Sequence, residues 1–206
     1  MIDHYDWPGG REAMLRFGPA GGPVVVAALP LFEEANRTRA FVVTILRGLA
    51  ERGIASAVPD LPGTGESLVP TAEAGLAAMR EAFAAVPGDY TLAIRSGALL
   101  DAGARKGRWQ LSPQPGADLV RELDRLRQVG ASGDYGGNLL SPGLLAELEG
   151  AEAGTARVVR LESDSKPADR KAPGAPLWRR AEPDNDPALA ALLADDIATW
   201  VRGCEG

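Results

Sequence analysis

Two reactive side chains are nearly absent from this 206-residue chain, which has one cysteine, Cys204, and one histidine, His4. A single cysteine excludes an internal disulfide bond. One cysteine and one histidine are also too few to build a Cys/His metal cluster, so we expect no bound metal. We interpret Cys204 as a cysteine at a frayed chain end rather than as a catalytic thiol.

The sequence also lacks basic clusters and long apolar runs. The formal net charge is −6, and no segment is dominated by lysine and arginine, which argues against a nucleic-acid partner. Runs such as VVVAALPLF are too short to cross a bilayer, and the opening MIDHYDWPGG has no apolar signal region, so we expect a cytoplasmic protein without a transmembrane segment. Hydrophobic residues still make up 45% of the chain, which is typical of a folded domain with a buried core.

Strand-like and helix-like segments alternate along much of the chain. Apolar runs predict strands at 14–17, 24–30, 54–60, 90–94, 108–113, 156–163 and 177–182, and residues 163–176 have the composition of a loop. Amphipathic spacing predicts helices over 37–53, from 76, from 96, around 119–126 and from Pro187 after an Asp186 N-cap. This alternation predicts a mostly parallel sheet with helices on both faces, in one domain over 1–206 with a reduced lid at 114–150.

The first loop of interest is VPDLPGTGES at 58–67, where a strand ends in Asp60 and is followed by Gly63 and Gly65. The glycines permit a tight turn with positive φ, so a purely structural role is the better reading. The loop lacks the lysine of a phosphate-binding loop, and no G-x-G-x-x-G follows either early strand. We therefore expect no nucleotide cofactor, and no cofactor of any other kind.

The second loop, LPLFEEANRTR at 29–39, lies between the first buried strand and the first helix. Its backbone N–H groups could polarise a carbonyl, and the adjacent carboxylates of Glu33 and Glu34 could serve in acid–base chemistry. The alternative is structural: a glutamate favours the positive end of the helix, and Asn36 holds the loop through side-chain hydrogen bonds. Phe32 and Asn36 are candidates for contact with a ligand.

The third segment, YTLAIRSGALLDAG at 90–103, has the strand–turn–helix pattern of the nucleophile elbow G-x-S-x-G. The five positions are Ala93, Ile94, Arg95, Ser96 and Gly97, so an arginine stands where the nucleophile should be. Arginine stays protonated and cannot act as a nucleophile. Ser96 is one place late, and we favour a helix N-cap role for it. No histidine occurs near 175–186, where a catalytic base would be expected, and an acid near Asp164 would have no histidine to orient.

The ordered set of these motifs resembles the exosortase A system-associated hydrolase 2 group of the α/β-hydrolase superfamily. Residues 30–39 are similar to its P-F-x-E-E-x-N-x-x-R loop with Leu31 inserted, and residues 60–67 are similar to its D-L-x-G-x-G-x-S turn. The pieces IRSGALL, WQLSP, NLLSPGLLAEL and PLWRRAE also resemble the family in the same order, over roughly residues 20–202. The resemblance implies an α/β-hydrolase fold and a context of bacterial exopolysaccharide export and protein sorting.

Together these observations predict a catalytically degenerate member of that group, a pseudoenzyme that binds a small anionic ligand. Arg95 would meet the anion, with Ser96, Phe32 and Asn36 around it. One alternative is an active serine esterase or thioesterase that uses Ser96, with Glu33 or Glu34 as its base. Another is a protein-interaction module built on DYGGNLLSPGLL at 134–145, and a homo-oligomer is compatible with the sequence.

Overall fold

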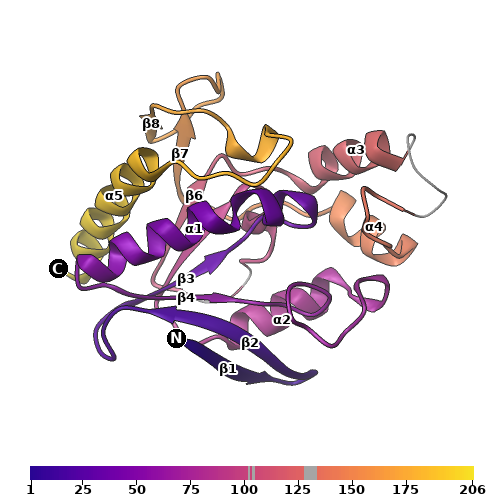
Figure 1. Ribbon diagram of the computed structural model, residues 1–206, viewed down its shortest axis with the longest axis horizontal. Helices are drawn as coiled ribbons and strands as arrows, with labels where there is room; N and C mark the ends of the chain where they lie inside the picture. Colours follow the sequence, from indigo (N-terminus) through magenta and orange to yellow (C-terminus); the bar gives the residue numbers. More distant parts are fainter. Residues whose placement is uncertain (102, 104, 128–133) are drawn as a thin grey trace.

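The computed structural model describes residues 1–101, 103, 105–127 and 134–206 (Figure 1). Its strands are β1 (Ile2–Trp7), β2 (Gly10–Phe17), β3 (Val24–Ala28), β4 (Ala55–Pro59), β5 (Tyr90–Ile94), β6 (Gly107–Leu111), β7 (Arg157–Leu161) and β8 (Arg170–Ala172). The α-helices are α1 (Glu33–Glu51), α2 (Leu76–Ala85), α3 (Gly116–Arg127), α4 (Pro142–Glu149) and α5 (Pro187–Glu205). Short 3₁₀ helices lie at η1 (Thr71–Glu73), η2 (Arg95–Leu99) and η3 (Leu177–Arg179).

The eight strands form one sheet in the order β1-β2-β4-β3-β5-β6-β7-β8. Strands β1 and β2 form an antiparallel hairpin, β2 runs antiparallel to β4, and the remaining pairs are parallel. The predicted mostly parallel sheet is therefore confirmed. Strand β5 lies between β3 and β6, so the turn that follows it opens at the middle of the carboxyl edge, where ligands bind in open α/β sheets.

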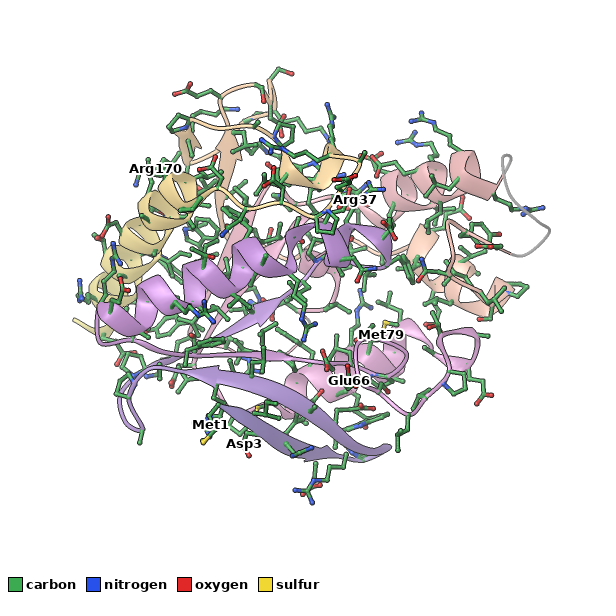
Figure 2. All side chains as sticks on the ribbon, in the orientation of Figure 1. Met1, Asp3, Arg37, Glu66, Met79 and Arg170 are labelled. Atoms are coloured by element: carbon green, nitrogen blue, oxygen red, sulfur yellow. The ribbon has the colours of Figure 1, made fainter. Side chains whose placement is uncertain are left out.

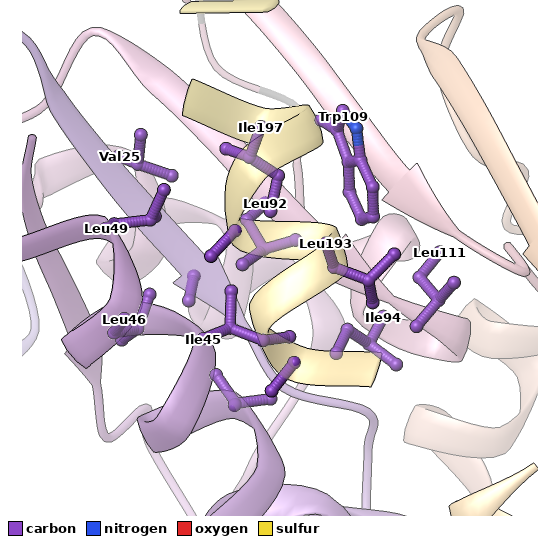
Figure 3. Packing of buried hydrophobic residues seen from close by; sticks show 14 of the residues in the cluster. Val25, Ile45, Leu46, Leu49, Leu92, Ile94, Trp109, Leu111, Leu193 and Ile197 are labelled. Atoms are coloured by element: carbon purple, nitrogen blue, oxygen red, sulfur yellow. The ribbon is translucent and has the colours of Figure 1, made fainter. Parts of the chain in front are cut away.

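One face of the sheet is covered by α1 and α5, which lie side by side (Figure 1). Figure 3 shows Ile45, Leu46 and Leu49 of α1 facing Leu193 and Ile197 of α5 above the strand residues. Each of these side chains is fully buried. The helical spacing of apolar residues, together with two-sided burial of β3 and β5, accounts for this layer.

The other face carries α2, α3 and α4, whose apolar residues join the opposite sides of the same strands. Val26 and Ala28 of β3 point to this second core, whereas Val25 and Ala27 point to the first. That alternation follows from the period of two along a strand. Helices α3 and α4 occupy most of the expected lid at 114–150, of which residues 128–133 lie outside the described part. Its role as a lid stays a prediction.

Three expectations about elements need correction. Strand β1 has no counterpart among the predicted strands. The strand expected at 177–182 is instead η3, and the last strand β8 lies at 170–172 inside the expected loop. The helix expected from Ser96 is only η2, because the chain must reach β6 at Gly107 within a short crossover. Residues 102 and 104 of that crossover lie outside the described residues.

The structure confirms the predicted start of the last helix, α5, residue by residue. Asp186 caps α5 by accepting a hydrogen bond from Leu189 N at 2.9 Å, and Pro187 is its first helical residue. At the end of α1, Gly53 has a φ of 75°, as a C′ glycine should. Within the described residues no helix is both long and apolar enough to cross a membrane. The cytoplasmic location stays a prediction.

Candidate functional site

The turn after β5 has the backbone of a nucleophile elbow, and Arg95 stands at its tip. Arg95 has a φ of 54°, a conformation that is uncommon for any residue other than glycine. A Cβ atom on Gly97 would lie 2.4 Å from the carbonyl oxygen of Ala28 and 2.6 Å from that of Leu29. Gly97 is therefore needed where the turn presses against the end of β3. The sequence left Ser96 open as an alternative nucleophile, and the backbone gives the strained position to Arg95.

The guanidinium of Arg95 is held between carboxylates and an indole ring. Its Nε and Nη2 each lie 3.2 Å from an oxygen of Glu34, in a two-pronged pair. Nη2 also lies 3.4 Å from both oxygens of Glu122 on α3, and the guanidinium carbon is 5.3 Å from the ring centre of Trp178. Only 14% of the Arg95 side chain is exposed. Its charge is thus matched inside the protein before any ligand arrives.

Glu34 is the more confined of the two carboxylates. Burial raises the pKa of Glu34 above its ordinary value, and the Arg95 charge and hydrogen bonds oppose that rise only in part. Glu122 is 45% exposed and also accepts a hydrogen bond from Gln114 Nε2 at 2.9 Å. Glu34 therefore depends on Arg95 more strongly than Glu122 does.

Ser96 has a different role from either role expected of it. It is completely buried, and its Oγ accepts a hydrogen bond from the Leu31 N–H at 2.9 Å. It does not cap η2, which begins at Arg95 with Ile94 in the cap position, so the N-cap expectation is wrong. The hydroxyl instead ties the turn after β5 to the loop after β3. This bond engages a loop N–H that could otherwise polarise a carbonyl.

Some of the other residues of the 29–39 loop make structural contacts, and two of them line a cavity. Phe32, with a φ of 59°, precedes α1, and Glu33 pairs with Arg37 at 3.6 Å on the same helix face. Figure 2 labels Arg37 near the α1 end that faces η3, where its Nη1 donates to the Trp178 carbonyl at 3.2 Å. The Asn36 side chain is exposed and forms no hydrogen bond with the described residues, so it does not hold the loop as the structural alternative expected. Phe32 and Asn36 line one cavity of about 410 Å³.

The turn at Asp60 is structural, as expected. The Asp60 carboxylate accepts two hydrogen bonds from Arg39, at 3.1 and 3.0 Å, and one from the Glu66 N–H at 3.1 Å. Gly63 and Gly65 have φ values of 79° and 53°. A Cβ on Gly65 would lie 2.3 Å from the Asp60 carboxylate, so glycine is required there.

An acid follows β7, where a catalytic acid was considered, but the one histidine of the chain lies on another strand. Asp164 follows β7, where it pairs with Arg160 at 2.7 Å. Burial alone would raise the pKa of Asp164, but hydrogen bonds from the Lys166 N–H and Arg160 outweigh burial and lower it. Trp178 stands after β8, and the one histidine, His4, is exposed on edge strand β1. Strands β2, β4 and β3 separate β1 from β5.

A cavity of about 450 Å³ lies beside Arg95 at the carboxyl edge of β6 and β7. We call it the basic cavity, because its lining includes six basic side chains and three acidic ones: Arg95, Arg121, Arg125, Arg160, Lys166 and Arg179, with Asp118, Glu122 and Asp164. Sequence reasoning missed its buried lining residues Ser112 and Gln114. The available signal was their place at the end of the strand predicted at 108–113, in SPQ at 112–114. Ser96 is not among the residues that line this cavity or that of Phe32 and Asn36.

Comparison with known proteins finds no match among protein-family models or curated proteins. Solved structures do match. Est1E from Butyrivibrio proteoclasticus, solved with ferulic acid bound, aligns over 98% of both chains with a TM-score of 0.59 and 13% identity. A thermophilic esterase from Thermogutta terrifontis, solved with malate bound, aligns over 100% of both chains with a TM-score of 0.54 and 14% identity. The chain has the α/β-hydrolase fold.

A third neighbour limits what this fold says about chemistry. The bottromycin epimerase BotH, solved with bottromycin A2, aligns over 97% of this chain and 98% of its own with a TM-score of 0.54 and 14% identity. The same fold thus occurs in a protein described as an esterase and in one described as an epimerase, so function has to be argued from the site. The exosortase association stays a prediction.

The expected interaction segment at 134–145 is partly buried. Tyr135 and Leu140 belong to the second core, whereas 60% of Leu139 is exposed. Leu126 on α3, which is 42% exposed, lies close to Gly136 of this segment. Docking of a protein here stays a prediction.

Proposed function

We propose that this protein is a catalytically inactive member of the α/β-hydrolase fold that binds a small anionic ligand at the carboxyl edge of its sheet. The observation that carries the proposal is the tip of the elbow, where Arg95 is paired with Glu34 at 3.2 Å. A group that is permanently protonated cannot attack an ester. We infer that the crevice at the carboxyl edge serves for binding, and that Arg95 holds Glu34 and Glu122 in place beside it.

The esterase alternative requires Ser96 to act as the nucleophile, because Arg95 stands at the tip of the turn. The geometry around Ser96 does not favour that role. Its Oγ is buried and accepts the Leu31 N–H, while Glu34, a proposed base, is already engaged by Arg95. Glu33 pairs with Arg37. A catalytic serine needs a base within hydrogen-bond reach and two free N–H donors for the oxyanion. Here both candidate bases are paired with arginines, and the Leu31 N–H is already donated to Ser96.

The anionic ligand is supported by the lining of the basic cavity rather than by Arg95 acting alone. Because Glu34 and Glu122 already match the Arg95 charge, we assign Arg95 the task of positioning these carboxylates at the cavity floor. Basic side chains of the cavity that are not already paired with a carboxylate meet the charge of the ligand. This refines the expectation that Arg95 itself would take the anion.

We further propose that the protein acts in an exosortase-associated exopolysaccharide or protein-sorting system. This part rests on the resemblance of residues 30–39 and 60–67 to that group. Deletion of the gene should impair polysaccharide export or surface-protein processing, and a copy carrying Ser96→Ala should restore it if the role is one of binding. Full export in the deletion strain would argue against the association.

The catalytic question is tested with a fluorophosphonate probe and a panel of aryl esters and thioesters. Wild type, Ser96→Ala and Ser112→Ala should show the same absence of labelling and turnover, while an active esterase in parallel confirms the probe. Labelling of wild type that disappears in Ser96→Ala would overturn the proposal in favour of the serine-hydrolase alternative. Labelling lost only in Ser112→Ala would place a nucleophile after β6 instead.

A further inference from the structure

The floor of the basic cavity holds two buried polar atoms without partners. Ser112 follows β6 with a φ of 46°, is 2% exposed, and its Oγ has no hydrogen-bond partner among the described residues. Gln114 is also 2% exposed, and its Oε1 is without a partner in the same way. Both residues line the cavity. Buried polar atoms are normally satisfied, so two unpartnered atoms on residues that line one cavity point to a ligand that completes them.

The orientation of the Gln114 amide is fixed by its neighbour. Its Nε2 donates to Glu122 Oε2 at 2.9 Å, and a flipped amide would place an oxygen against that carboxylate. Oε1 is therefore the amide atom left without a hydrogen-bond partner, and as a carbonyl oxygen it can only accept a hydrogen bond. The Gln114 backbone is held as well, since its N–H donates to the Arg95 carbonyl at 3.3 Å. The cavity floor thus offers a fixed acceptor beside a serine hydroxyl that can donate or accept.

The side chains that line the basic cavity carry more positive than negative charge, although the whole chain has a net charge of −6. All three acidic side chains of the basic cavity are already in ion pairs: Asp118 with Arg121 and Lys166, Glu122 with Arg95, and Asp164 with Arg160. Arg125 and Arg179 form no ion pair with any residue that the structure describes. These two exposed guanidinium groups are free to meet an anion.

From these observations we infer that the basic cavity binds a polyhydroxylated small-molecule anion, a sugar phosphate or a sugar acid. Arg125 and Arg179 take its phosphate or carboxylate, and Ser112 and Gln114 take its hydroxyl groups. An amine could also donate to Gln114 Oε1, but its positive charge would be repelled by the basic rim. The volume of about 450 Å³ suits a ligand of this size. This inference rests on the proposed function and names its ligand class.

Calorimetric titration of the full chain with glucose 6-phosphate, glucuronate, glucose and inorganic phosphate tests the assignment. At least one of the two sugar anions should bind more tightly than glucose and inorganic phosphate, and the stronger one identifies the anionic group. Arg125→Ala combined with Arg179→Ala should weaken that binding at least about tenfold. Arg47→Ala, an exposed arginine of α1 outside the cavity, should leave it unchanged.

Two further variants separate the floor from the rim. Ser112→Ala and Gln114→Met should each weaken binding of the sugar anion by about fivefold and leave binding of inorganic phosphate unaffected. Circular-dichroism melting curves establish that each variant is folded before it is titrated. A sugar anion that binds no better than inorganic phosphate would overturn the assignment of the floor.

The outcomes also separate this inference from the function on which it rests. Anion binding that survives the double arginine variant would refute the inference and leave the proposed anion-binding role standing at another place. Failure of all four probes to bind at millimolar concentration would overturn both. Turnover of an ester by wild type would overturn only the claim that the protein is inactive.

Discussion

Replacement of Arg95 by methionine tests the central feature of the site, its buried ion pair. Methionine keeps much of the side-chain length and the same backbone cost at positive φ, so the lost charge dominates the effect. Unit charges 3.2 Å apart, as in the Arg95–Glu34 pair, attract by about 5 kcal/mol at an effective dielectric constant of about 20. Desolvation opposes that gain, but removal of one partner leaves Glu34 buried and unpaired. We therefore expect Arg95→Met to lower the free energy of unfolding by about 3 kcal/mol near neutral pH.

The pH dependence gives this prediction a second, independent mark. The pKa of Glu34 is already raised in the folded protein, and it should rise further without Arg95, which holds it down. A raised carboxyl pKa means that the folded state binds the proton more tightly than the unfolded state does, so stability increases as the pH falls through that range. The cost of Arg95→Met should therefore be largest above the raised pKa and should shrink as Glu34 becomes protonated.

Urea unfolding followed by circular dichroism, from about pH 8 down to about pH 5, measures both effects. Glu34→Gln and the double variant complete a cycle, in which the two changes should be coupled by about 1–3 kcal/mol. An Arg95→Met variant that loses less than about 1 kcal/mol at high pH, or a loss independent of Glu34, would show that the pair contributes little. The account of Arg95 as a positioning residue would then be refuted.

Three more substitutions probe the frame of the site and its core. Gly97→Ala places a methyl group against the carbonyl oxygens of Ala28 and Leu29, and should cost about 3 kcal/mol or abolish folding; a normal melting temperature would contradict the elbow geometry. Ser96→Ala leaves the Leu31 N–H without its acceptor and should cost about 1–3 kcal/mol in urea unfolding, with an unchanged midpoint as the contrary result. Burial would raise the pKa of Asp196, but its bonds to Arg157, Trp109 and Arg170 outweigh burial and lower it, so stability should be lost as the pH falls through that lowered pKa. The stability difference between wild type and Asp196→Asn should accordingly shrink in acid unfolding experiments, and a constant difference would disprove the assignment.

The central strands and the last helix were predictable because short stretches of sequence carry the apolar pattern that each of them buries. The runs at 24–30 and 90–94 are apolar on both faces, as β3 and β5 must be under two layers of helices. Strand β8 has only three residues, RKA, and pairs with a single neighbour, β7. Its conformation depends on that pairing rather than on local propensity, so the sequence offered no signal for it.

The site divides in the same way. The elbow pattern from Ala93 to Gly97 could be read from the sequence because the turn is local, but the choice between Arg95 and Ser96 for its tip needed the backbone. The partners of Arg95 could not be read from the sequence, since Glu122 comes from α3 and Trp178 from η3, and their approach depends on how these elements pack. The burial of Ser96 against Leu31 likewise joins two loops 65 residues apart.

The hydrogen bond from Leu31 to Ser96 also bears on what would be needed to build a serine hydrolase at this site. Arg95→Ser would place a hydroxyl at the tip of the turn, yet the Leu31 N–H would still be donated to Ser96, and the one histidine, His4, would still lie on edge strand β1. Each of these obstacles needs its own substitution, and none of the three brings activity by itself. An engineer who wanted hydrolysis from this frame would therefore have to supply a nucleophile, a base and a free N–H together, and Arg95→Ser alone should give no turnover.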